Sequence, residues 1–428
     1  MTRQIYWEKG EFNIWVLLLC AYHFFPFITV KGSVLLYVWA YGIPLLFIVC
    51  NLNYLKRIVN ALVYTEILGT VGFLFVLICL SILIPVLKGT NDFTYFSDAI
   101  MTMVKIIMRM LFIVMVIVKY IPKATKETFM KYFVFSCYLY ICSTIIMVVM
   151  PAVKELAFEL IKESEETKIL AQDARYTTRY GWAGFSGFEY TFKCALAMIF
   201  NNFLIEKKLK NRNVWFMIGG SMFLLLGTLF YGRIGSLFGI VILAVLLIKI
   251  LWKRPKILIV AIICSVAGGI ALLILQSRNQ SIKIWFEWAF DLFVTFFRTG
   301  KLQTGSSNVL IERMLFIPKE DTILFGDGMY TVAKGYYMST DAGIMRPLLF
   351  GGLGFAVIRY ASLYFVLVLN ILKRTEDVAI RTLYFWSFFL CFMFEIKGEI
   401  LFSCLPIVMW LVVIDNYAKR REIYGTRS

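Results

Sequence analysis

The sequence predicts an all-α polytopic membrane protein, and its composition and its hydrophobic pattern both support this fold class. Of its 428 residues, 60% are hydrophobic and 17% are charged, and the mean hydropathy is +0.78. A soluble domain carries about 25% charged residues and about 45–50% apolar ones. The apolar residues also come in blocks of about twenty, which is the length that crosses a bilayer core as a helix. A cytosolic enzyme is therefore excluded.

The apolar blocks predict about twelve transmembrane helices. No internal repeat and no appended soluble domain is visible, so we expect residues 1–428 to form a single integral membrane domain. The first block is long and lacks a small-residue cleavage site, so we expect it to remain as the first helix. The expected spans are 12–29, 33–51, 63–86, 98–119, 131–151, 183–204, 214–231, 235–252, 257–275, 347–371, 382–396 and 399–415.

The basic residues indicate the orientation. Lys and Arg number 44 against 27 Asp and Glu, a net charge of +17, and they gather in connections such as 207–212, 253–256 and 419–421. With the N-terminus in the cytoplasm these connections lie inside, as the positive-inside rule requires. We therefore expect cytoplasmic termini, membrane lipids as partners and no nucleic-acid partner. The four short outer turns then hold one cation each, namely Lys31, Lys88, Arg233 and Lys397.

Cysteine and histidine usage limits the chemistry. All 9 cysteines lie inside apolar blocks, and the 1 histidine, His23, lies in the first of them. A disulfide framework, a zinc-ligand spacing and a Ser-His-Asp triad outside the membrane are therefore not expected. We expect His23 to serve helix packing, and we expect no metal and no cofactor.

Two connections are long enough to hold a functional site, 152–182 and 276–346, and both fall on the expected outer face. Each contains an amphipathic helical pattern, and the pattern is stronger in the second loop. Trp285 and Trp288 suit the headgroup level of a membrane. These segments are expected to cover a cavity that opens to the outer leaflet. The apolar face of the second pattern comprises Ile282, Trp285, Phe286, Ala289, Phe290, Phe293 and Phe297.

The fourth expected span carries buried charge, which is costly in a membrane and marks a functional candidate. Lys105 and Arg109 require an anion, and Glu189, Glu395, Glu399 or a bound ligand could supply it. The two interpretations left open are an internal ion pair that fixes helix packing and contact with a lipid-linked phosphate. Steps of four, three and four place on one helix face Asp98, Thr102, Lys105 and Arg109.

Arginines also stand beside glycines and aromatic residues at the outer face. The turn over 231–236 reads YGRIGS, and Arg233 is its single charge. Arg233 is either a residue that extends to the interface or an anion clamp, since a guanidinium offers a fixed fork of donors to a diphosphate. Arg175 and Arg179 end the first loop among Tyr180 and Trp182, which fit a sugar-phosphate site and an aromatic belt equally well.

The second loop ends in an ordered series of polar and glycine residues. Gly326-Asp327-Gly328 alone indicates a turn, but the order of the whole series carries more information. Carboxylates beside arginines could serve as an acceptor base and a leaving-group clamp. The series comprises Arg313, Gly326-Asp327-Gly328, Tyr336, Asp341, Arg346 and the glycines of 351–354.

That order resembles the Wzy family of O-antigen and capsular repeat-unit polymerases, whose superfamily includes the O-antigen ligases. The resemblance covers nearly the whole chain through its layout of about a dozen spans and two large outer loops. It rests on short motifs, namely Arg233 between glycines, Arg313 before Gly326-Asp327-Gly328, and Asp341 before a glycine-rich span. The ligases carry a histidine in the second large loop, and this loop has none, which favours a polymerase.

The resemblance implies a metal-independent glycosyl transfer in the bacterial inner membrane. The growing chain would move from undecaprenyl pyrophosphate to a hydroxyl of the next lipid-linked repeat unit. Arg233 and Arg313 would stabilise charge on the departing diphosphate. Asp341 is the first choice as general base, with Glu189 and Asp327 in reserve. The expected substrate-binding residues are Arg175, Arg179, Lys105, Arg109, Glu189, Asp327, Tyr336 and Arg346.

Two other functions remain open at this stage. A transporter or flippase of lipid-linked oligosaccharide is the first, although transporters commonly show repeated halves and this sequence does not. An O-antigen ligase is the second. The sequence also leaves open whether a chain-length regulator is a further partner, which sugars are used and which linkage is formed.

Overall fold

The structure is a computed structural model. It describes residues 7–8, 10–26, 34–63, 67–161, 163–185, 187–208, 214–253, 280–300, 305–333, 335–373 and 377–425. The chain divides into two compact units, each of which is described by itself. Unit 1 comprises Met1–Gly42 and Met130–Leu302, and unit 2 comprises Ile43–Phe129 and Gln303–Ser428.

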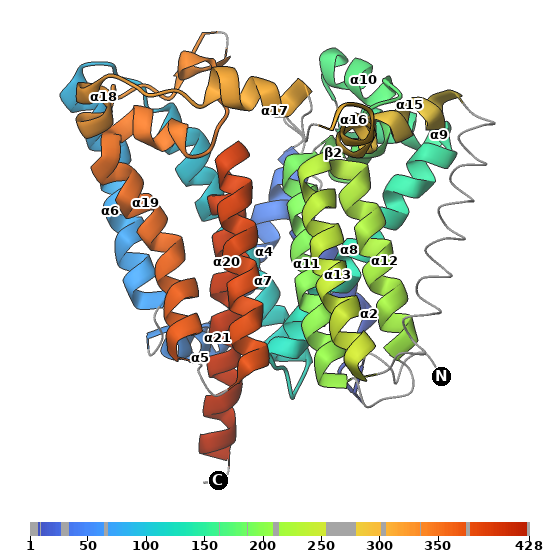
Figure 1. The fold of residues 1–428 in the computed structure, drawn as a ribbon. Coiled ribbons are helices and arrows are strands. Elements are labelled where there is room, and N and C mark those ends of the chain that lie inside the picture. Colours follow the sequence, from blue (N-terminus) through green and yellow to red (C-terminus); the bar gives the residue numbers. More distant parts are fainter. Residues whose placement is uncertain are drawn as a thin grey trace. The chain divides into compact units, whose positions relative to one another are not determined.

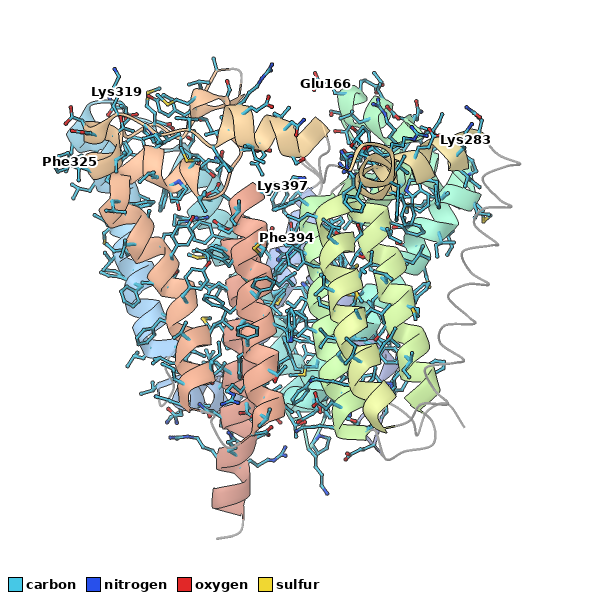
Figure 2. All side chains as sticks on the ribbon, in the orientation of Figure 1. Glu166, Lys283, Lys319, Phe325, Phe394 and Lys397 are labelled. Atoms are coloured by element: carbon cyan, nitrogen blue, oxygen red, sulfur yellow. The ribbon has the colours of Figure 1, made fainter. Side chains whose placement is uncertain are left out.

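Unit 1 is a helical bundle centred on α11 (Phe188–Lys208). α11 is buried along most of its length and packs against α12 (Val214–Tyr231) and α13 (Arg233–Lys253). α15 (Gln280–Ala289) and α16 (Asp291–Thr299) lie across the ends of these helices (Figure 1). At that end of the unit lie the charged side chains of Glu166 and Lys283 (Figure 2).

The remaining elements of unit 1 are short, apart from one long helix. The long helix is α8, whose residues from Met130 onward belong to unit 1. The strands β1 and β2 form an antiparallel pair between residues 180 and 185. These elements are α2 (Ile14–Phe24), α3 (Val34–Tyr37), η1 (Val38–Gly42), α8 (Lys126–Val149), α9 (Pro151–Ile161), α10 (Glu165–Gln172), η3 (Thr177–Arg179), β1 (Tyr180–Gly181) and β2 (Gly184–Phe185).

Helix ends in unit 1 follow local sequence signals. The side-chain oxygen of Asn13 accepts hydrogen bonds from the first backbone N–H groups of α2, and Ser164 caps α10 in the same way. Such caps satisfy backbone donors that have no partner inside the helix. α16 ends at Gly300, whose φ of 69° is the left-handed conformation that glycine adopts without a Cβ clash.

Unit 2 is built around α19 (Met345–Lys373), which packs against α6 (Ile67–Lys88), α18 (Glu320–Phe325) and α20 (Val378–Lys397). α21 (Leu401–Gly425) packs against α7 (Met101–Tyr120) and α5 (Leu52–Val63) (Figure 1). Within this unit Lys319 and Phe325 lie at the helix ends, whereas Phe394 lies deeper along α20 (Figure 2). The other elements of unit 2 are α4 (Ile43–Cys50), η2 (Tyr95–Ile100), α17 (Gly305–Val309), η4 (Leu310–Met314), β3 (Thr331–Val332), β4 (Gly335–Tyr336) and η5 (Tyr337–Ser339).

The protein is a multi-pass membrane protein by helix length and hydropathy. The described residues hold 5 helices long and apolar enough to cross a membrane, or up to 7 if each of 2 bent pairs is one span. This confirms the all-α membrane class but not the larger number of spans expected from the sequence. The expected span 257–275 lies outside the described residues. The five straight candidates are Ile67–Lys88, Tyr95–Tyr120, Lys126–Val149, Val378–Lys397 and Leu401–Arg421.

The other expected spans correspond to helices that are shorter, bent or more polar. α2 and Phe216–Tyr231 are apolar but short, and α19 bends by 47° between Ser362 and Tyr364. Val38–Cys50 turns by 90° into α5. α5 was expected to be a connection, but it is an amphipathic helix that buries Ile58 and Ala61. One apolar face on a polar helix is the pattern of a segment that lies along a membrane surface.

Candidate functional site

Two arginines of unit 1 lie against one indole ring. The Cζ atoms of Arg179 and Arg233 are 4.8 Å and 5.2 Å from the ring centroid of Trp288. Arg179 also lies 4.8 Å from the ring of Tyr176. These separations are within the range of cation–π attraction. The structure therefore brings together the end of the first long loop, the turn between α12 and α13, and the amphipathic helix of the second long loop. We call Arg179, Arg233 and Trp288 the arginine cluster.

The arginine cluster carries a surplus of positive charge. Arg233 forms an ion pair of 2.6 Å with Asp291 of α16. Arg179 takes part in none of the ion pairs found among the described residues, and its buried Nε has no hydrogen-bond partner there. Burial lowers the pKa of Arg179 to about 10, Tyr176 opposes this shift and the charge of Arg233 adds to it. The guanidinium is still charged at neutral pH. Arg179 and Arg233 therefore contribute two positive charges against the one negative charge of Asp291, and this surplus favours binding of an anion.

The helix α15 holds Trp288 in place because its apolar face is buried. Trp285, Trp288 and Ala289 form a buried cluster with Phe230 at the end of α12. The indole N–H of Trp285 donates to the hydroxyl of Thr178 at 3.1 Å, and that hydroxyl donates to the carbonyl of Phe230 at 2.8 Å. Thr178 is the neighbour of Arg179, so the same contacts fix the loop and the helix.

Glycines let the backbone approach the arginine cluster closely. A Cβ atom at Gly235 would lie 1.8 Å from the hydroxyl oxygen of Thr191 on α11, and one at Gly187 would lie 3.0 Å from the Cζ of Arg179. Neither Gly232 nor Gly235 has a positive φ. The glycines that flank Arg233 are therefore required for helix contact, whereas the sequence had suggested a turn conformation.

Two other residues of unit 1 that we expected to bind substrate have partners within the chain. Arg175 is exposed and forms an ion pair of 2.6 Å with Asp173. Glu189 forms an ion pair of 2.6 Å with Lys193 one turn further along α11, and Lys193 also donates to the carbonyl of Phe24 at 2.8 Å. Arg175 also lies 5.3 Å from the ring of Tyr176, which Arg179 contacts as well, whereas the ion pair of Glu189 does not join that residue to the arginine cluster.

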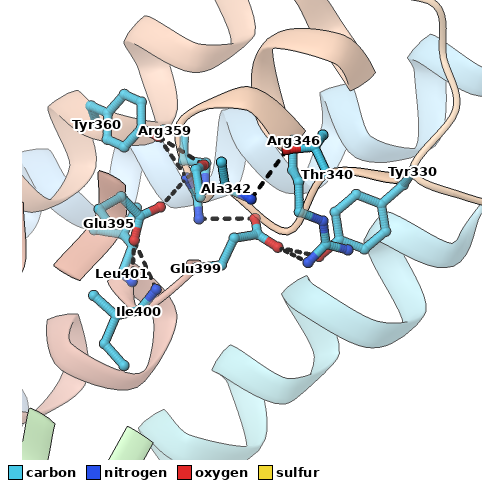
Figure 3. A network of polar contacts seen from close by, with 11 residues as sticks. Tyr330, Thr340, Ala342, Arg346, Arg359, Tyr360, Glu395, Glu399, Ile400 and Leu401 are labelled. Atoms are coloured by element: carbon cyan, nitrogen blue, oxygen red, sulfur yellow. Dashed lines mark hydrogen bonds and ion pairs between the residues drawn. The ribbon is translucent and has the colours of Figure 1, made fainter. Parts of the chain in front are cut away.

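Unit 2 contains a buried network of two arginines and two glutamates (Figure 3). Arg359 lies 2.5 Å from Glu395 and 3.0 Å from Glu399, with its own side chain 0% exposed. Glu399 also lies 2.5 Å from Arg346 and accepts a hydrogen bond from the hydroxyl of Tyr330. Two positive and two negative side chains balance, which is the condition for holding charge in an apolar interior.

Arg346 of this network lies between two tyrosine rings. Its Cζ is 3.8 Å from the ring centroid of Tyr330 and 3.9 Å from that of Tyr336. Its Nε is buried without a hydrogen-bond partner among the described residues. The stacking and the ion pair with Glu399 fix the plane of the guanidinium and leave one of its edges unused.

A cavity of about 280 Å³ opens beside Arg346. Its lining joins the start of the span Tyr95–Tyr120 to the second long loop and to the segment before α21. Lys105 and Arg109, which the sequence placed on the same helix face, do not line it. The lining includes Asp98, Thr102, Tyr330, Tyr336, Arg346 and Glu399.

The remaining residues predicted in unit 2 are dispersed. Arg313 is exposed in η4, Lys105 is half-buried and Arg109 is buried on α7. Asp327 accepts hydrogen bonds from Thr322 at 2.9 Å and Tyr337 at 3.1 Å, so it fixes its own turn. Glu395 and Glu399, considered as partners for Lys105 and Arg109, bond Arg359 and Arg346 instead.

Asp341 is exposed in the loop before α19. Partial desolvation by neighbouring protein atoms nevertheless raises the pKa of its carboxyl group, and the cations Lys397 and Arg346 oppose this shift. A carboxylate with a raised pKa is a better proton acceptor, which is the property that a general base requires.

Sequence reasoning missed the central residue of the network in unit 2. Arg359 stands inside an expected span, and a lone intramembrane arginine is a functional signal that could have identified it. No such signal marks Tyr330 or Asp291, because the partner of each is distant in the sequence. Glu399 lies 69 residues from Tyr330, and Arg233 lies 58 residues from Asp291.

Comparisons with models of protein families, with curated proteins and with solved structures found no match for this chain. The membrane class therefore rests on helix length and hydropathy.

Proposed function

We propose that the protein is a membrane glycosyltransferase that polymerises lipid-linked oligosaccharide repeat units, as its resemblance to the Wzy family implies. The observation that carries the proposal is the surplus charge of the arginine cluster. A diphosphate bears negative charge that increases as it departs, and fixed guanidinium donors stabilise such charge without rearrangement. Arg179 and Arg233 supply these donors, and only Arg233 has a carboxylate partner among the described residues.

In the proposed reaction a hydroxyl oxygen of the incoming repeat unit forms a bond to the anomeric carbon of the growing chain. The bond between that carbon and the diphosphate oxygen breaks, and undecaprenyl pyrophosphate departs with the electron pair. The hydroxyl proton passes to a carboxylate and from there to water. The carboxylate role is assigned to Asp341 from the resemblance, and the raised pKa of this residue is compatible with proton acceptance. Arg313 is assigned to diphosphate stabilisation from the resemblance, and its exposed side chain is accessible to a ligand.

The proposed setting is the bacterial inner membrane. About twelve spans, cytoplasmic termini and two outer-face loops with amphipathic helices complete the proposal. The concentration of Lys and Arg in the connections on one side supports this orientation. α15 buries its aromatic face and exposes Lys283 and Glu287, which is the behaviour of a helix at an aqueous interface.

The decisive experiment uses the purified full chain in lipid nanodiscs with lipid-linked repeat units. We expect a ladder of polymer on a gel, together with release of undecaprenyl pyrophosphate, in the presence of a chelator of divalent metals. A parallel assay in sealed vesicles measures movement of the same lipid across the bilayer. Movement without a ladder would replace the polymerase with a transporter. Transfer only to a lipid A core acceptor would indicate a ligase.

A further inference from the structure

The cavity beside Arg346 differs from the arginine cluster in its charge. Arg346 and Arg359 are matched by Glu395 and Glu399, so the network that forms one wall is neutral. Asp98 lines the cavity as well and is exposed. The ionised groups that line or support the cavity therefore carry a slight surplus of negative charge, so a diphosphate or a uronate is disfavoured here.

The polar groups of the cavity match a ligand that carries many hydroxyl groups. Thr102, Thr331 and Ser403 contribute hydroxyls to the lining. Asp98 accepts a hydrogen bond from Ser97 at 2.8 Å, and a carboxylate has capacity to accept several more. Hydroxyl groups can both donate and accept hydrogen bonds, and the carboxylate accepts them. The lining therefore offers both kinds of partner that a polyol requires.

Tyr336 provides an apolar surface at the mouth of the cavity. One face of its ring is covered by Arg346 at 3.9 Å, yet the residue remains 47% exposed. An aromatic face is electron-rich, and the C–H groups on one side of a pyranose ring carry partial positive charge. A sugar ring can therefore stack on the outer face of Tyr336, whose plane is fixed by the arginine beneath it.

The size of the cavity limits the ligand. Pockets for drug-sized ligands measure about 300–1,000 Å³, and this cavity of about 280 Å³ is slightly smaller. A cavity of this size suits one sugar ring better than several.

We propose that the cavity formed by Asp98, Arg346 and Tyr336 binds one uncharged pyranose residue and discriminates against anionic sugars. The inference rests on the proposed function as a glycosyltransferase and assigns the class of sugar that unit 2 accepts. Tyr336 is the stacking surface, Arg346 fixes that surface from its inner face, and Asp98 accepts from a sugar hydroxyl and repels carboxylates. Glu399 positions Arg346, because its two oxygens already accept from Arg346, Arg359 and Tyr330.

Saturation-transfer NMR on the full chain in nanodiscs tests this site. The probes are methyl glucopyranoside, methyl N-acetylglucosaminide and methyl glucuronide. We expect both uncharged glycosides to bind and the glucuronide to bind roughly tenfold more weakly, because two carboxylates would be a few ångström apart. Tyr336→Ala should weaken binding of the uncharged glycosides roughly fivefold, whereas Tyr336→Phe keeps the ring and should retain it.

Two further variants separate the site from general effects on folding. Asp98→Asn should raise binding of the glucuronide toward that of the uncharged glycosides, a gain that a damaged fold does not produce. Val332→Ala is the matched control, because Val332 is 43% exposed on the neighbouring strand β3 and does not line the cavity. It should bind all three probes as the wild type does.

The outcomes distinguish this inference from the proposed function. Unchanged glycoside binding in Tyr336→Ala, or displacement of the glycosides by inorganic diphosphate, would overturn the sugar site even if polymer ladders form. Binding that depends on Tyr336, in a protein that makes no polymer, would support the sugar site and overturn the polymerase. Equal binding of glucuronide and uncharged glycosides to the wild type would overturn the discrimination.

Discussion

Arg359 of α19 and Glu395 of α20 form an ion pair of 2.5 Å, in which the arginine side chain is 0% exposed and the glutamate side chain 3%. The second oxygen of Glu395 accepts from the backbone N–H groups of Ile400 and Leu401 at 2.8 Å and 2.9 Å. The pair therefore joins α19 and α20 to the first turn of α21. It also orients Glu399, which bonds Arg359 with one oxygen and Arg346 with the other.

Loss of Arg359 should destabilise the protein strongly. Arg359→Leu leaves Glu395 charged in an apolar interior, and removing one member of a buried pair costs about 3–5 kcal/mol. Adding Glu395→Gln removes the unmatched charge and should recover part of the loss. The measurement is the fraction of folded protein in detergent after heating, read by gel filtration. Arg381→Leu changes an exposed arginine of α20 and should have little effect. A double variant less stable than the single one would contradict this account.

Replacing either arginine of the cluster should remove polymer synthesis. Arg179→Ala and Arg233→Ala each delete a charged donor, and losing one such donor lowers a rate about 10²–10³-fold. The lysine variants keep the charge but lose the planar fork, so we expect intermediate activity. Arg313→Ala should lower polymer synthesis as much as Arg179→Ala and Arg233→Ala do.

The assay for these variants is the polymer ladder at equal membrane protein levels. Arg298→Ala is the matched control, because Arg298 is exposed on α16, the helix that also supplies Asp291. Wild-type ladders from Arg179→Ala or Arg233→Ala would remove that residue from the diphosphate site.

The glycine two residues after Arg233 should tolerate no side chain. A Cβ at Gly235 would lie 1.8 Å from Oγ1 and 2.9 Å from Cβ of Thr191. Gly235→Ala must therefore move α13 away from α11 and displace Arg233, so we expect loss of polymer and a lower unfolding temperature. Thr191→Ala removes the nearest atom and should restore part of both properties in the double variant.

Gly219→Ala on α12 is the control for the glycine substitution, because no neighbouring atom lies within 4 Å of the added Cβ. Polymer formation is measured by the gel ladder and the unfolding temperature by heating, both on one preparation of each variant. If Gly235→Ala behaved as Gly219→Ala does, close helix contact would not be what positions Arg233.

Lys154 should titrate below the ordinary range for lysine. Burial lowers its pKa from 10.5 to about 8, and the charge of Glu155 opposes this shift. Its ammonium group donates to the carbonyl of Ala171 and to Thr177 at 3.0 Å. Folding disfavours the charged form of Lys154. The free-energy cost of burying that charge is fully present below pH 8 and disappears as the pH rises toward 10.5. The stability of the first loop should therefore increase over that interval.

Competitive acylation with mass spectrometry measures the Lys154 titration directly. Lys154 should react with a midpoint near 8, whereas Lys168, whose pKa is raised by its hydrogen bond to Glu165, should react only at higher pH. In Lys154→Met the rise in loop stability between pH 8 and 10.5 should disappear. A midpoint for Lys154 at the ordinary value would refute the prediction.

The sequence by itself determined the membrane class and the positions of most long helices, because hydrophobic length and helical period are local properties. It also directed attention to Arg179, Arg233, Tyr336 and Arg346, since arginines beside glycines and aromatic residues are unusual at a membrane face. Hydropathy did not determine the number of spans, because some apolar blocks form shorter helices, such as Ile14–Phe24 and Phe216–Tyr231.

Only the tertiary structure decided which of these arginines carry unmatched charge. Arg233 meets an aspartate 58 residues away and Arg346 meets a glutamate 53 residues away, and such pairings depend on packing between distant segments. Arg175 and Arg179 are near neighbours in sequence, yet the first is exposed in an ion pair with Asp173 and the second stacks on Trp288. Charge balance is a property of the folded neighbourhood, so a sequence can nominate charged residues but cannot show which of them are neutralised.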